Sequence, residues 1–260
     1  MPYRVKILGV SSVAKNVKRF ACQKPRFLKL RVVFEHYQNS TRPSNHSLQT
    51  SGILKVEKPS DYRFIPGQAT LVAIDKKGWR HKQRPFTFTS LNSSNHLEFI
   101  IKTYKGNKGV TNELDRAKAG DFLLIREPFG SINYAGEGVF IAGGAGITPF
   151  IAILKQLKKD MNLGSNKLIF FNKTEADIIL KKELKEIFKS KRKNLILALT
   201  EQEKKGYFCK RASKLFFKEN ISDFSQKFYI CGPELFIIDV IKFLKQLGAK
   251  KSSIVVERDF

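Results

Sequence analysis

The pattern of hydrophobic and polar positions changes character near residue 135. Before that point, apolar runs of strand length are separated by turn residues such as Pro-Gly, Lys-Lys-Gly and Ala-Gly-Asp. The runs are VKILGV, QATLVAID, FTFTS, LEFIIKTY and DFLLIREPF. Short strands with regular turn signals are typical of a small antiparallel β-barrel. One helical pattern, GVTNELDRAKAG, interrupts them and ends on Gly120, which is suited to a C-cap.

After residue 135 the apolar pattern predicts strands that alternate with amphipathic helices. The predicted helices are TPFIAILKQLKKD, KKELKEIFKS and ELFIIDVIKFLKQLG, and in the first of them Phe150, Ile153, Leu154 and Leu157 form one stripe. Such alternation indicates a mostly parallel sheet covered on both faces. The predicted strands are GVFIAGG, KLIFF, NLILAL, KFYIC and SIVVE.

The chain is therefore predicted to have two domains, an antiparallel β-barrel over residues 1–134 and an open α/β parallel sheet over residues 135–260, joined by SINYAGEG. Residues 22–55 fit neither pattern, because QNSTRPSNHSLQTSG within them is polar and reads as a loop. We expect a loop inserted near 22–55. A faint echo between VKRFACQKP and LKVEKPSDYRF leaves a short duplication open.

Composition narrows the class of protein. Hydrophobic residues make up 42% of the 260-residue chain, which allows a packed core. No apolar run is long enough to span a bilayer, and no signal peptide is predicted. Cys22, Cys209 and Cys231 lie far apart without a Cys-x-x-Cys spacing, so neither a zinc site nor an iron–sulfur cluster is expected. A reduced, cytoplasmic chain is the simplest interpretation.

The formal net charge of +25 is large. Lysine-rich helix faces such as KKELKEIFKSKRK account for most of it. Basic proteins attract nucleic acids, anionic membranes and acidic proteins. No nucleic-acid-binding motif is present, so an acidic protein partner is the interpretation that stays open.

The segment GGAGITPF at 143–150 follows a predicted strand and opens a helix. Gly144 and Gly146 let the backbone approach a ligand closely, Thr148 is placed to cap the helix, and Pro149 suits its first turn. The helix N-terminus then offers free N–H groups to a pyrophosphate. A tight strand-to-helix turn without a ligand is the alternative.

Two further turns could contact a ligand. GNKGVTNEL is a second glycine-rich entry into a helix, and YICGPELF ends a predicted parallel strand, where ligands bind in open α/β sheets. An ordinary helix start and a buried small residue are the respective alternatives. The candidate residues are Gly109, Val110 and Thr111 in the first turn and Cys231, Gly232 and Pro233 in the second.

RPFTFTS at 84–90 combines a cation, aromatic rings and hydroxyls. Arg84 can bind phosphate in a bidentate manner, Phe86 offers a flat face to a planar ring, and Thr87 offers a hydroxyl to a ring nitrogen. Alternation puts Arg84 and Phe86 on one face of the strand and Thr87 on the other. A ligand that touches all three must lie across the strand end. A core strand with a surface arginine is the alternative.

In this order, R-x-[aromatic]-[S/T]-x-x-S, G-V-T, G-x-G-x-T-P and C-G-P, followed by a C-terminal aromatic, the motifs resemble the ferredoxin–NADP reductase family, most of all its short bacterial flavodoxin/ferredoxin reductase-like members. The resemblance covers roughly residues 56–260 and a first strand near 4–20. It implies a barrel that binds FAD and an α/β domain that binds NAD(P)H. The implied enzyme passes a hydride from NAD(P)H to FAD and then single electrons to a separate acceptor such as flavodoxin or ferredoxin.

The resemblance also implies roles for residues. Arg84 would bind the flavin phosphates, and Phe86 would stack on the isoalloxazine. The implied catalytic residues are Thr87 near flavin N5, Cys231 beside the nicotinamide, and Glu257 near the flavin. The other implied cofactor-binding residues are Pro85, Gly109, Val110, Thr111, Gly144, Gly146, Thr148, Pro149, Gly232, Pro233 and Phe260.

The nucleotide and the acceptor are less defined. Lys173 and Arg211 could contact a 2′-phosphate, which favours NADP over NAD, although both could be ordinary surface charges. An acidic electron-transfer protein is the expected partner, while free flavin, ferric chelates or an oxygenase component are alternative acceptors. A non-catalytic basic interaction protein is a further alternative, if the 22–55 segment disrupts the barrel.

Overall fold

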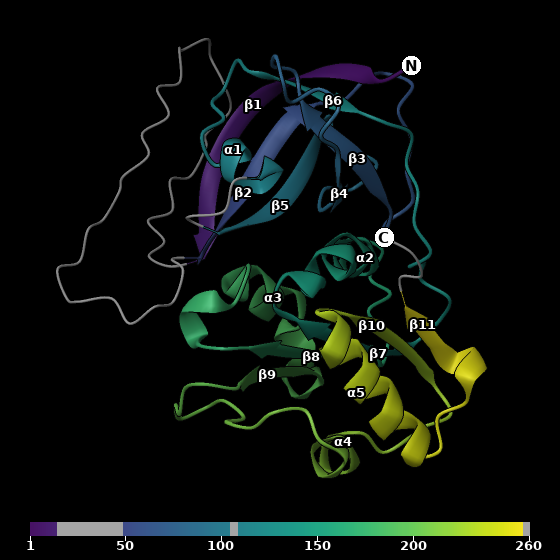
Figure 1. Cartoon of the computed structure of the whole chain (residues 1–260). Helices are drawn as coiled ribbons and strands as arrows, with labels where there is room; N and C mark the ends of the chain where they lie inside the picture. Colours follow the sequence, from purple (N-terminus) through teal and green to yellow (C-terminus); the bar gives the residue numbers. More distant parts are fainter. Residues whose placement is uncertain (15–48, 105–108, 257–260) are drawn as a thin grey trace, which may run out of the picture.

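The computed structural model describes residues 1–14, 49–104 and 109–256. These residues form two sheets. Figure 1 shows the antiparallel sheet above the parallel one, with helices α2 (Thr148–Lys159) and α3 (Lys181–Ile187) between them. The fold class expected from the sequence is confirmed. The domain boundary at residue 134 stays a prediction.

The first sheet has six strands in the order β4-β3-β6-β1-β2-β5, all paired antiparallel. A bridge between Phe88 and Phe99, together with a 2.8 Å hydrogen bond from Thr89 N to Glu98 O, joins the end of β4 to β5. This contact brings the two edges of the sheet together as a barrel. The strands are β1 (Tyr3–Ala14), β2 (Gln49–Glu57), β3 (Ala69–Ile74), β4 (Arg84–Thr87), β5 (His96–Tyr104) and β6 (Phe122–Ile125).

Aromatic side chains fill the barrel. Phe64 stacks on Phe88 with 4.2 Å between ring centroids, and Tyr62 and Phe99 contact Phe88 from other directions. The Tyr62 hydroxyl donates to the carbonyl oxygen of Arg126 at 2.5 Å, so the buried ring keeps a polar partner. Burial raises the pKa of this phenol far above its ordinary value.

Two predictions for this half need correction. The segment set apart as residues 22–55 overlaps β2, whose register from Gln49↔Tyr104 to Glu57↔His96 runs along all of β5. Residues 22–48 lie outside the described residues. The helix predicted from GVTNELDRAKAG is only α1 (Val110–Leu114), with Asp115 as its C-cap. Gly120, with φ +98°, instead turns the chain into β6 and donates to Ile7 O.

The second sheet is parallel, with the strand order β11-β10-β7-β8-β9. The direction of strand addition reverses between β7 and β10, and ligands of open α/β sheets bind at the carboxyl ends of strands at such a point. The strands are β7 (Gly138–Gly143), β8 (Lys167–Asn172), β9 (Leu195–Leu199), β10 (Lys227–Cys231) and β11 (Ile254–Val256).

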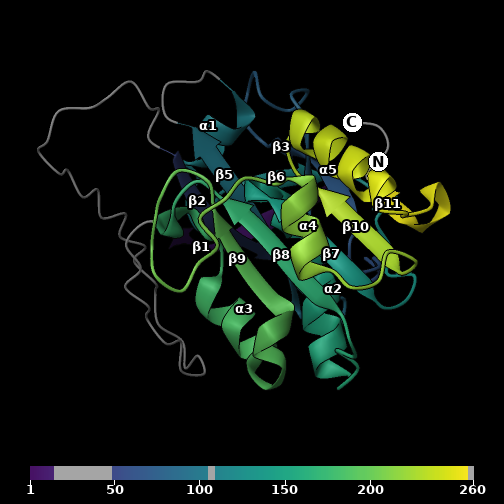
Figure 2. The same ribbon diagram turned by 90° about the horizontal axis from the view of Figure 1, so that it is seen from below.

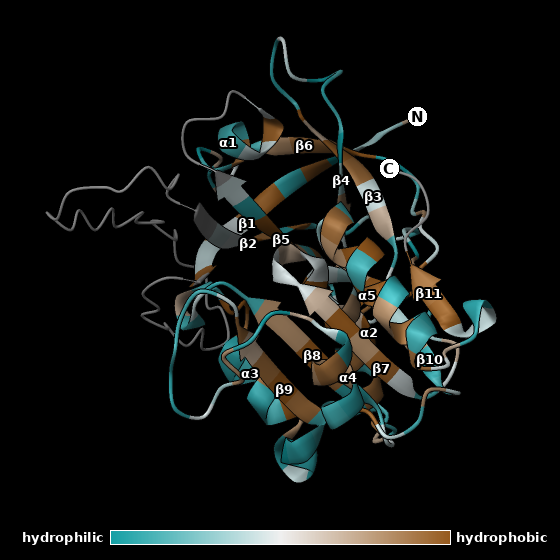
Figure 3. Ribbon diagram, turned by 60° about the horizontal axis from the view of Figure 1, so that its bottom comes forward, coloured by the Kyte–Doolittle hydropathy of each residue, from teal (hydrophilic) through white to brown (hydrophobic). Residues whose placement is uncertain are grey.

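Helices cover both faces of this sheet. The apolar stripe predicted for α2 is buried, and it packs with α3 on the face toward the barrel. Helices α4 and α5 cover the opposite face, as Figure 2 shows. Helix α4 was not predicted from the sequence. Figure 3 shows the strands between the two layers as predominantly hydrophobic. The helices are α2 (Thr148–Lys159), α3 (Lys181–Ile187), α4 (Lys214–Asn220) and α5 (Glu234–Gln246).

The two halves meet over α2. A Cβ on Gly67, whose φ is +103°, would lie 2.0 Å from Ile132 O and 3.2 Å from Ile153 Cδ1 of α2. The buried side chain of Ile100, from β5, belongs to the same apolar cluster as α2. The position at Gly67 therefore accepts only glycine, both because of its backbone angle and because of this close approach. Within the described residues, no helix has the length and apolar character needed to cross a membrane.

Candidate functional site at the junction of the two sheets

The carboxyl ends of β7 and β10 lie in direct backbone contact. A Cβ on Gly146 would lie 2.3 Å from Cys231 O and 2.5 Å from Gly232 N. The sequence analysis assigned Gly146 to the close approach of a ligand, and the structure shows that this glycine is required by the neighbouring Cys-Gly-Pro turn. Gly144 has φ +54°, and no atom of the described residues lies within 4 Å of the position of a Cβ on it, so this glycine is the one with space beside it. The two glycine-containing turns thus form one unit.

Thr148 does not cap α2 with its side chain. Its φ and ψ of −58° and −43° are helical, Ile147 is the N-cap, and a 3₁₀ turn over Gly144–Ile147 precedes the helix. The Thr148 hydroxyl instead donates to Ala145 O at 3.1 Å, while Pro149 lies in the first turn as expected. The hydroxyl therefore stabilises the glycine-rich turn and leaves the first N–H groups of α2 without a side-chain cap.

Asn172 ends β8 and has a buried side-chain amide. Asn172 is 5% exposed, and neither its Nδ2 nor its Oδ1 has a hydrogen-bond partner among the described residues. Buried polar groups are paired in the great majority of cases, so such an orphan calls for an explanation. Its position at the carboxyl end of a parallel strand suits a bound ligand that supplies the missing hydrogen bonds. From the sequence, this segment was expected to offer a cation and a hydroxyl to the nucleotide, and the Asn172 amide was given no role.

The RPFTFTS segment lies on β4 at an edge of the barrel sheet. Arg84 is exposed, and its guanidinium donates only to the adjacent Gln83 O, at 2.8 Å, among the described residues. Pro85, Phe86 and Thr87 are half-buried, and Phe86 packs partly against the barrel core. The arginine is therefore available to an anion, whereas the Phe86 ring has only part of its surface free for a ligand.

A lysine of α2 connects this segment to the α/β half. Lys155 Nζ donates to Thr89 O at 2.9 Å and lies 3.1 Å from Glu98 Oε1, which also accepts from the Thr89 hydroxyl at 2.9 Å. Burial raises the pKa of Glu98, but the Lys155 charge and the Thr89 hydrogen bond outweigh it, so that the pKa lies below its ordinary value. Both Thr89 and Glu98 are buried. These contacts hold α2 against β5 and against Thr89, which lies two residues beyond the strand that carries Arg84.

The remaining predicted residues fall into three groups. Gly109 is the N-cap of α1, with Val110 buried and Thr111 half-buried behind it. Cys231 is half-buried at the end of β10. Glu257 and Phe260 lie outside the described residues, so their predicted roles are not addressed by the structure.

Lys173 and Arg211, the two residues predicted to contact a 2′-phosphate, differ in their surroundings. Lys173 Nζ lies 2.8 Å from Glu201 Oε1, so the lysine charge is paired with a carboxylate. The backbone supports this arrangement, because Glu201 N donates to Lys173 O at 2.9 Å. Arg211 is exposed. Glu201 was not predicted as a site residue, although its position two residues after a predicted strand was a usable signal.

Known proteins match both halves of the chain. A family model of an oxidoreductase FAD-binding domain matches residues 49–134, and one of an oxidoreductase NAD-binding domain matches residues 140–242. Human cytochrome b5 reductase 4 is 32% identical over 176 residues, which are 63% of this chain and 34% of that protein. The anthranilate 1,2-dioxygenase electron transfer component of Acinetobacter baylyi is 30% identical over 227 residues, which are 81% of this chain and 63% of that protein.

The chain thus spans about a third of the human relative and less than two thirds of the bacterial one. Among solved structures, a ferredoxin NADP⁺ reductase from Neisseria gonorrhoeae with bound FAD and NADP has a TM-score of 0.72 and 18% identity, covering 100% of this chain and 99% of that chain. At this identity the likeness concerns the fold. It extends over both sheets and the junction between them.

Proposed function

Since the chain belongs to the ferredoxin–NADP reductase-like family of NAD(P)H-dependent flavoprotein oxidoreductases, we propose that it carries electrons from NAD(P)H through FAD to a separate one-electron acceptor. The observation that carries the proposal is the link from Lys155 to Thr89 and Glu98. It connects the helix that follows the glycine-rich turn to β5 and to Thr89, just beyond the strand that carries Arg84. A flavin on one and a nicotinamide on the other would be held in a fixed relation, which is the protein's main contribution to such a reaction.

The residues present fit both cofactors. When bound, FAD accepts a hydride from the nicotinamide and releases electrons one at a time. Arg84 would hold the flavin phosphates, Thr87 would donate a hydrogen bond at the reactive edge of the ring, and Gly109–Thr111 would hold the pyrophosphate. The turn at Gly144 and the orphan amide of Asn172 would hold the dinucleotide, and Cys231 would exclude water beside the nicotinamide.

The choice between NADP and NAD depends on the charge around Lys173 in this proposal. NADPH carries a 2′-phosphate that NADH lacks, so a site prefers NADPH only where a cation is available to bind that phosphate. In this structure Glu201 pairs with Lys173 at 2.8 Å. We infer that Glu201 limits the use of NADPH, and that Arg211 alone would leave both nucleotides usable. The ratio of kcat/KM for NADPH to that for NADH should rise at least fivefold in Glu201→Gln. An unchanged ratio would remove Lys173 from the proposed phosphate site.

The acceptor proposed first is an acidic electron-transfer protein, because the chain carries a net charge of +25. Initial rates with flavodoxin, ferredoxin and cytochrome b5, each at two ionic strengths, test this. The rate with the true class of acceptor should fall steeply as salt rises, because opposite charges steer the encounter. Turnover that occurs only with free flavin or ferric chelates would contradict it. A reduced, cytoplasmic setting stays a prediction from the cysteine spacing.

A second acceptor has a specific observation in its favour. The bacterial relative matched over 81% of this chain is the electron transfer component of a dioxygenase. An oxygenase component would then be the partner. Reduction of an iron–sulfur oxygenase component at rates above those with flavodoxin and ferredoxin would favour this candidate.

A further inference from the structure

A groove runs along the edge of the parallel sheet between α3, β9 and residues 204–208. We call it the edge groove. Its volume is about 650 Å³, within the range of ligand sites, and its floor is apolar. The floor consists of Phe188, Leu195, Ile196 and Leu197. None of the residues assigned above to FAD or NAD(P)H lines it, so the edge groove is separate from the proposed cofactor sites.

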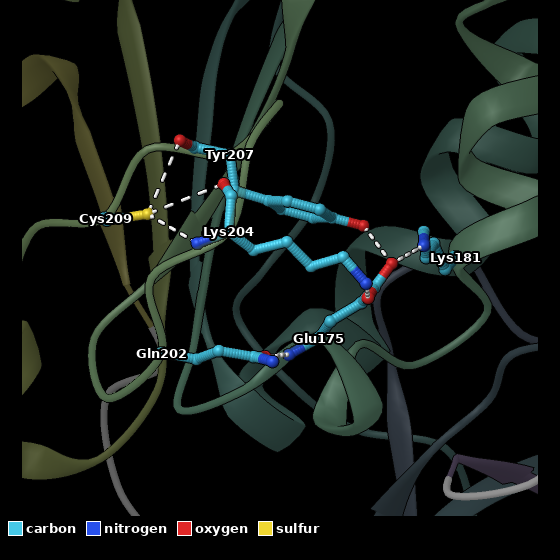
Figure 4. A network of polar contacts seen from close by, with 6 residues as sticks. All are labelled: Glu175, Lys181, Gln202, Lys204, Tyr207 and Cys209. Carbon is cyan, nitrogen blue, oxygen red and sulfur yellow. Dashed lines mark hydrogen bonds and ion pairs between the residues drawn. The ribbon is translucent and has the colours of Figure 1, made fainter.

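Four residues that line the edge groove form a network around Glu175, which Figure 4 shows: Glu175, Lys181, Lys204 and Tyr207. The Glu175 carboxylate accepts from Lys181 and from Lys204, and the Tyr207 hydroxyl donates to it at 2.5 Å. The hydrogen bond from Lys181, followed by those from Lys204 and Tyr207, lowers the pKa of Glu175 to about 2. The network joins the start of α3 to the segment that carries Lys204 and Tyr207. Its two lysines neutralise the charge of the Glu175 carboxylate.

The walls carry a strong excess of positive charge. Seven lysine and arginine side chains line the edge groove against two glutamates, Glu175 and Glu186. Lys189 lies 3.4 Å from Glu186. Within the part of the chain that the structure describes, no ion pair involves the other four cations of the walls. These are Lys182, Lys185 and Arg192 on the α3 side and Lys205 on the facing segment.

The spacing of these cations suits an extended chain better than a compact anion. Lys182, Lys185 and Lys189 follow one another by three and four residues along α3 and the turn after it, which spreads them over roughly 10 Å. Alternate side chains of an extended peptide lie about 7 Å apart and on one face, so two acidic residues can meet this row. A single phosphate group spans too little of it.

The partly unpaired edge of β9 also favours an extended peptide as the ligand. β9 is the outer strand of its sheet, and a neighbouring segment covers only its later part, where Phe208 N donates to Leu197 O and Leu199 N donates to Phe208 O. Among the described residues, the earlier part of β9, at Leu195 and Ile196, has β8 on one side and no strand on the other. Exposed strand edges can accept an added strand from a peptide.

We propose that the edge groove binds an extended acidic segment of a partner protein, with carboxylates on the α3 lysines and apolar side chains on the floor. The site is independent of the electron-transfer chemistry proposed above. It would hold a partner by a segment outside the cofactor sites. The lysines could instead serve only to keep the strand edge from pairing with other chains, and the experiment separates these two roles.

The test measures the affinity of the full chain for a labelled, end-blocked peptide that alternates Glu and Val, by fluorescence anisotropy. We expect saturable binding that weakens with salt, and at least a tenfold increase in Kd in Lys182→Glu/Lys185→Glu. The matched control is Lys242→Glu/Lys245→Glu, which makes the same charge change at the same spacing on exposed positions of α5. Its Kd should change less than threefold.

A second variant guards against misfolding of the first. Lys205→Glu lies on the facing wall, outside any helix, and should also weaken peptide binding. The proposal is overturned if the peptide does not bind the native chain, or if the α3 and α5 variants weaken binding equally. It is also overturned if inorganic tripolyphosphate at equal ionic strength displaces the peptide more strongly than unlabelled peptide does, because the site would then select compact anions.

Discussion

Lys155 Nζ lies 3.1 Å from Glu98 Oε1, and this ion pair connects α2 of the α/β half to β5 of the barrel. Both side chains are largely buried, at 18% and 10% exposure. Burial makes the Glu98 charge dependent on Lys155, because a buried charge without a partner is strongly unfavourable. Lys155 Nζ also lies 3.4 Å from Glu183 Oε1. The pair therefore fixes the relation of the two halves, and through it the distance between the proposed cofactor sites.

This relation predicts non-additive effects in a double-mutant cycle. Lys155→Met should lower the free energy of unfolding by about 3 kcal/mol, because Glu98 is left buried without its cation. Lys155→Met combined with Glu98→Gln should lose less than Lys155→Met alone. Urea unfolding of the native chain, the two single variants and the double variant measures the coupling. Lys158→Met, at an exposed position of the same helix, is the control. Additive losses would mean that the two residues act separately.

Gly146 is predicted to be intolerant of a methyl group. A Cβ there would lie 2.3 Å from Cys231 O, so Gly146→Ala must push the two turns apart. We expect a loss of roughly 1–3 kcal/mol in urea unfolding and weaker binding of NAD(P)H. Gly9→Ala is the control, since nothing lies within 4 Å of its Cβ position. Equal stability of the two variants would contradict the close packing of the turns.

Asn172 is predicted to serve a ligand more than the fold. Asn172→Leu removes an unpartnered buried amide, so the free energy of unfolding without ligand should stay equal or rise. The affinity for NAD(P)H should fall at least fivefold. Asn166→Leu is the matched comparison, because that buried amide bonds to Gly138 N and to the Tyr134 hydroxyl, and its loss should cost about 2 kcal/mol. A large loss of stability in Asn172→Leu would show a structural role.

The pKa of Glu175 predicts a dependence of stability on pH. The folded pKa, about 2, lies below the ordinary value of 4.5, so its contribution is present above pH 4.5 and is lost as pH falls toward 2. The difference in free energy of unfolding between the native chain and Glu175→Gln should shrink across that window. Glu203→Gln, an exposed carboxylate outside the network, serves as the control. A difference that stays constant over the window would contradict the network.

Most of the fold could be predicted from the sequence. The strands β7, β8 and β9 are apolar runs, and their burial follows directly from that pattern. β2 was missed because it lies at the end of a polar stretch and its pairing with β1 and β5 is set by distant residues. α1 is shorter than its pattern because the chain after Asp115 turns to enter β6.

The site was predictable only in outline. The glycine-rich turns could be located from the sequence. Position 146 must be glycine because of its contact with Cys231, which lies 85 residues further along the chain. The pairing of Lys173 with Glu201 and of Lys155 with Glu98 depends in the same way on tertiary contacts. The orphan amide of Asn172 could not be inferred at all, because it reflects the partners that surrounding residues fail to provide.

We propose that one chain binds FAD at Arg84 and passes electrons to it from NAD(P)H. The most direct test is the visible spectrum of the purified protein, supplied with FAD, before and after anaerobic addition of NADH or NADPH. We predict flavin absorption bands that bleach within seconds in the native chain, and at least tenfold weaker retention of FAD in Arg84→Ala with unfolding unchanged. Arg80→Ala, a nearby exposed arginine, should retain FAD. A protein that stays colourless after reconstitution, or whose bands neither nucleotide bleaches, would contradict the account.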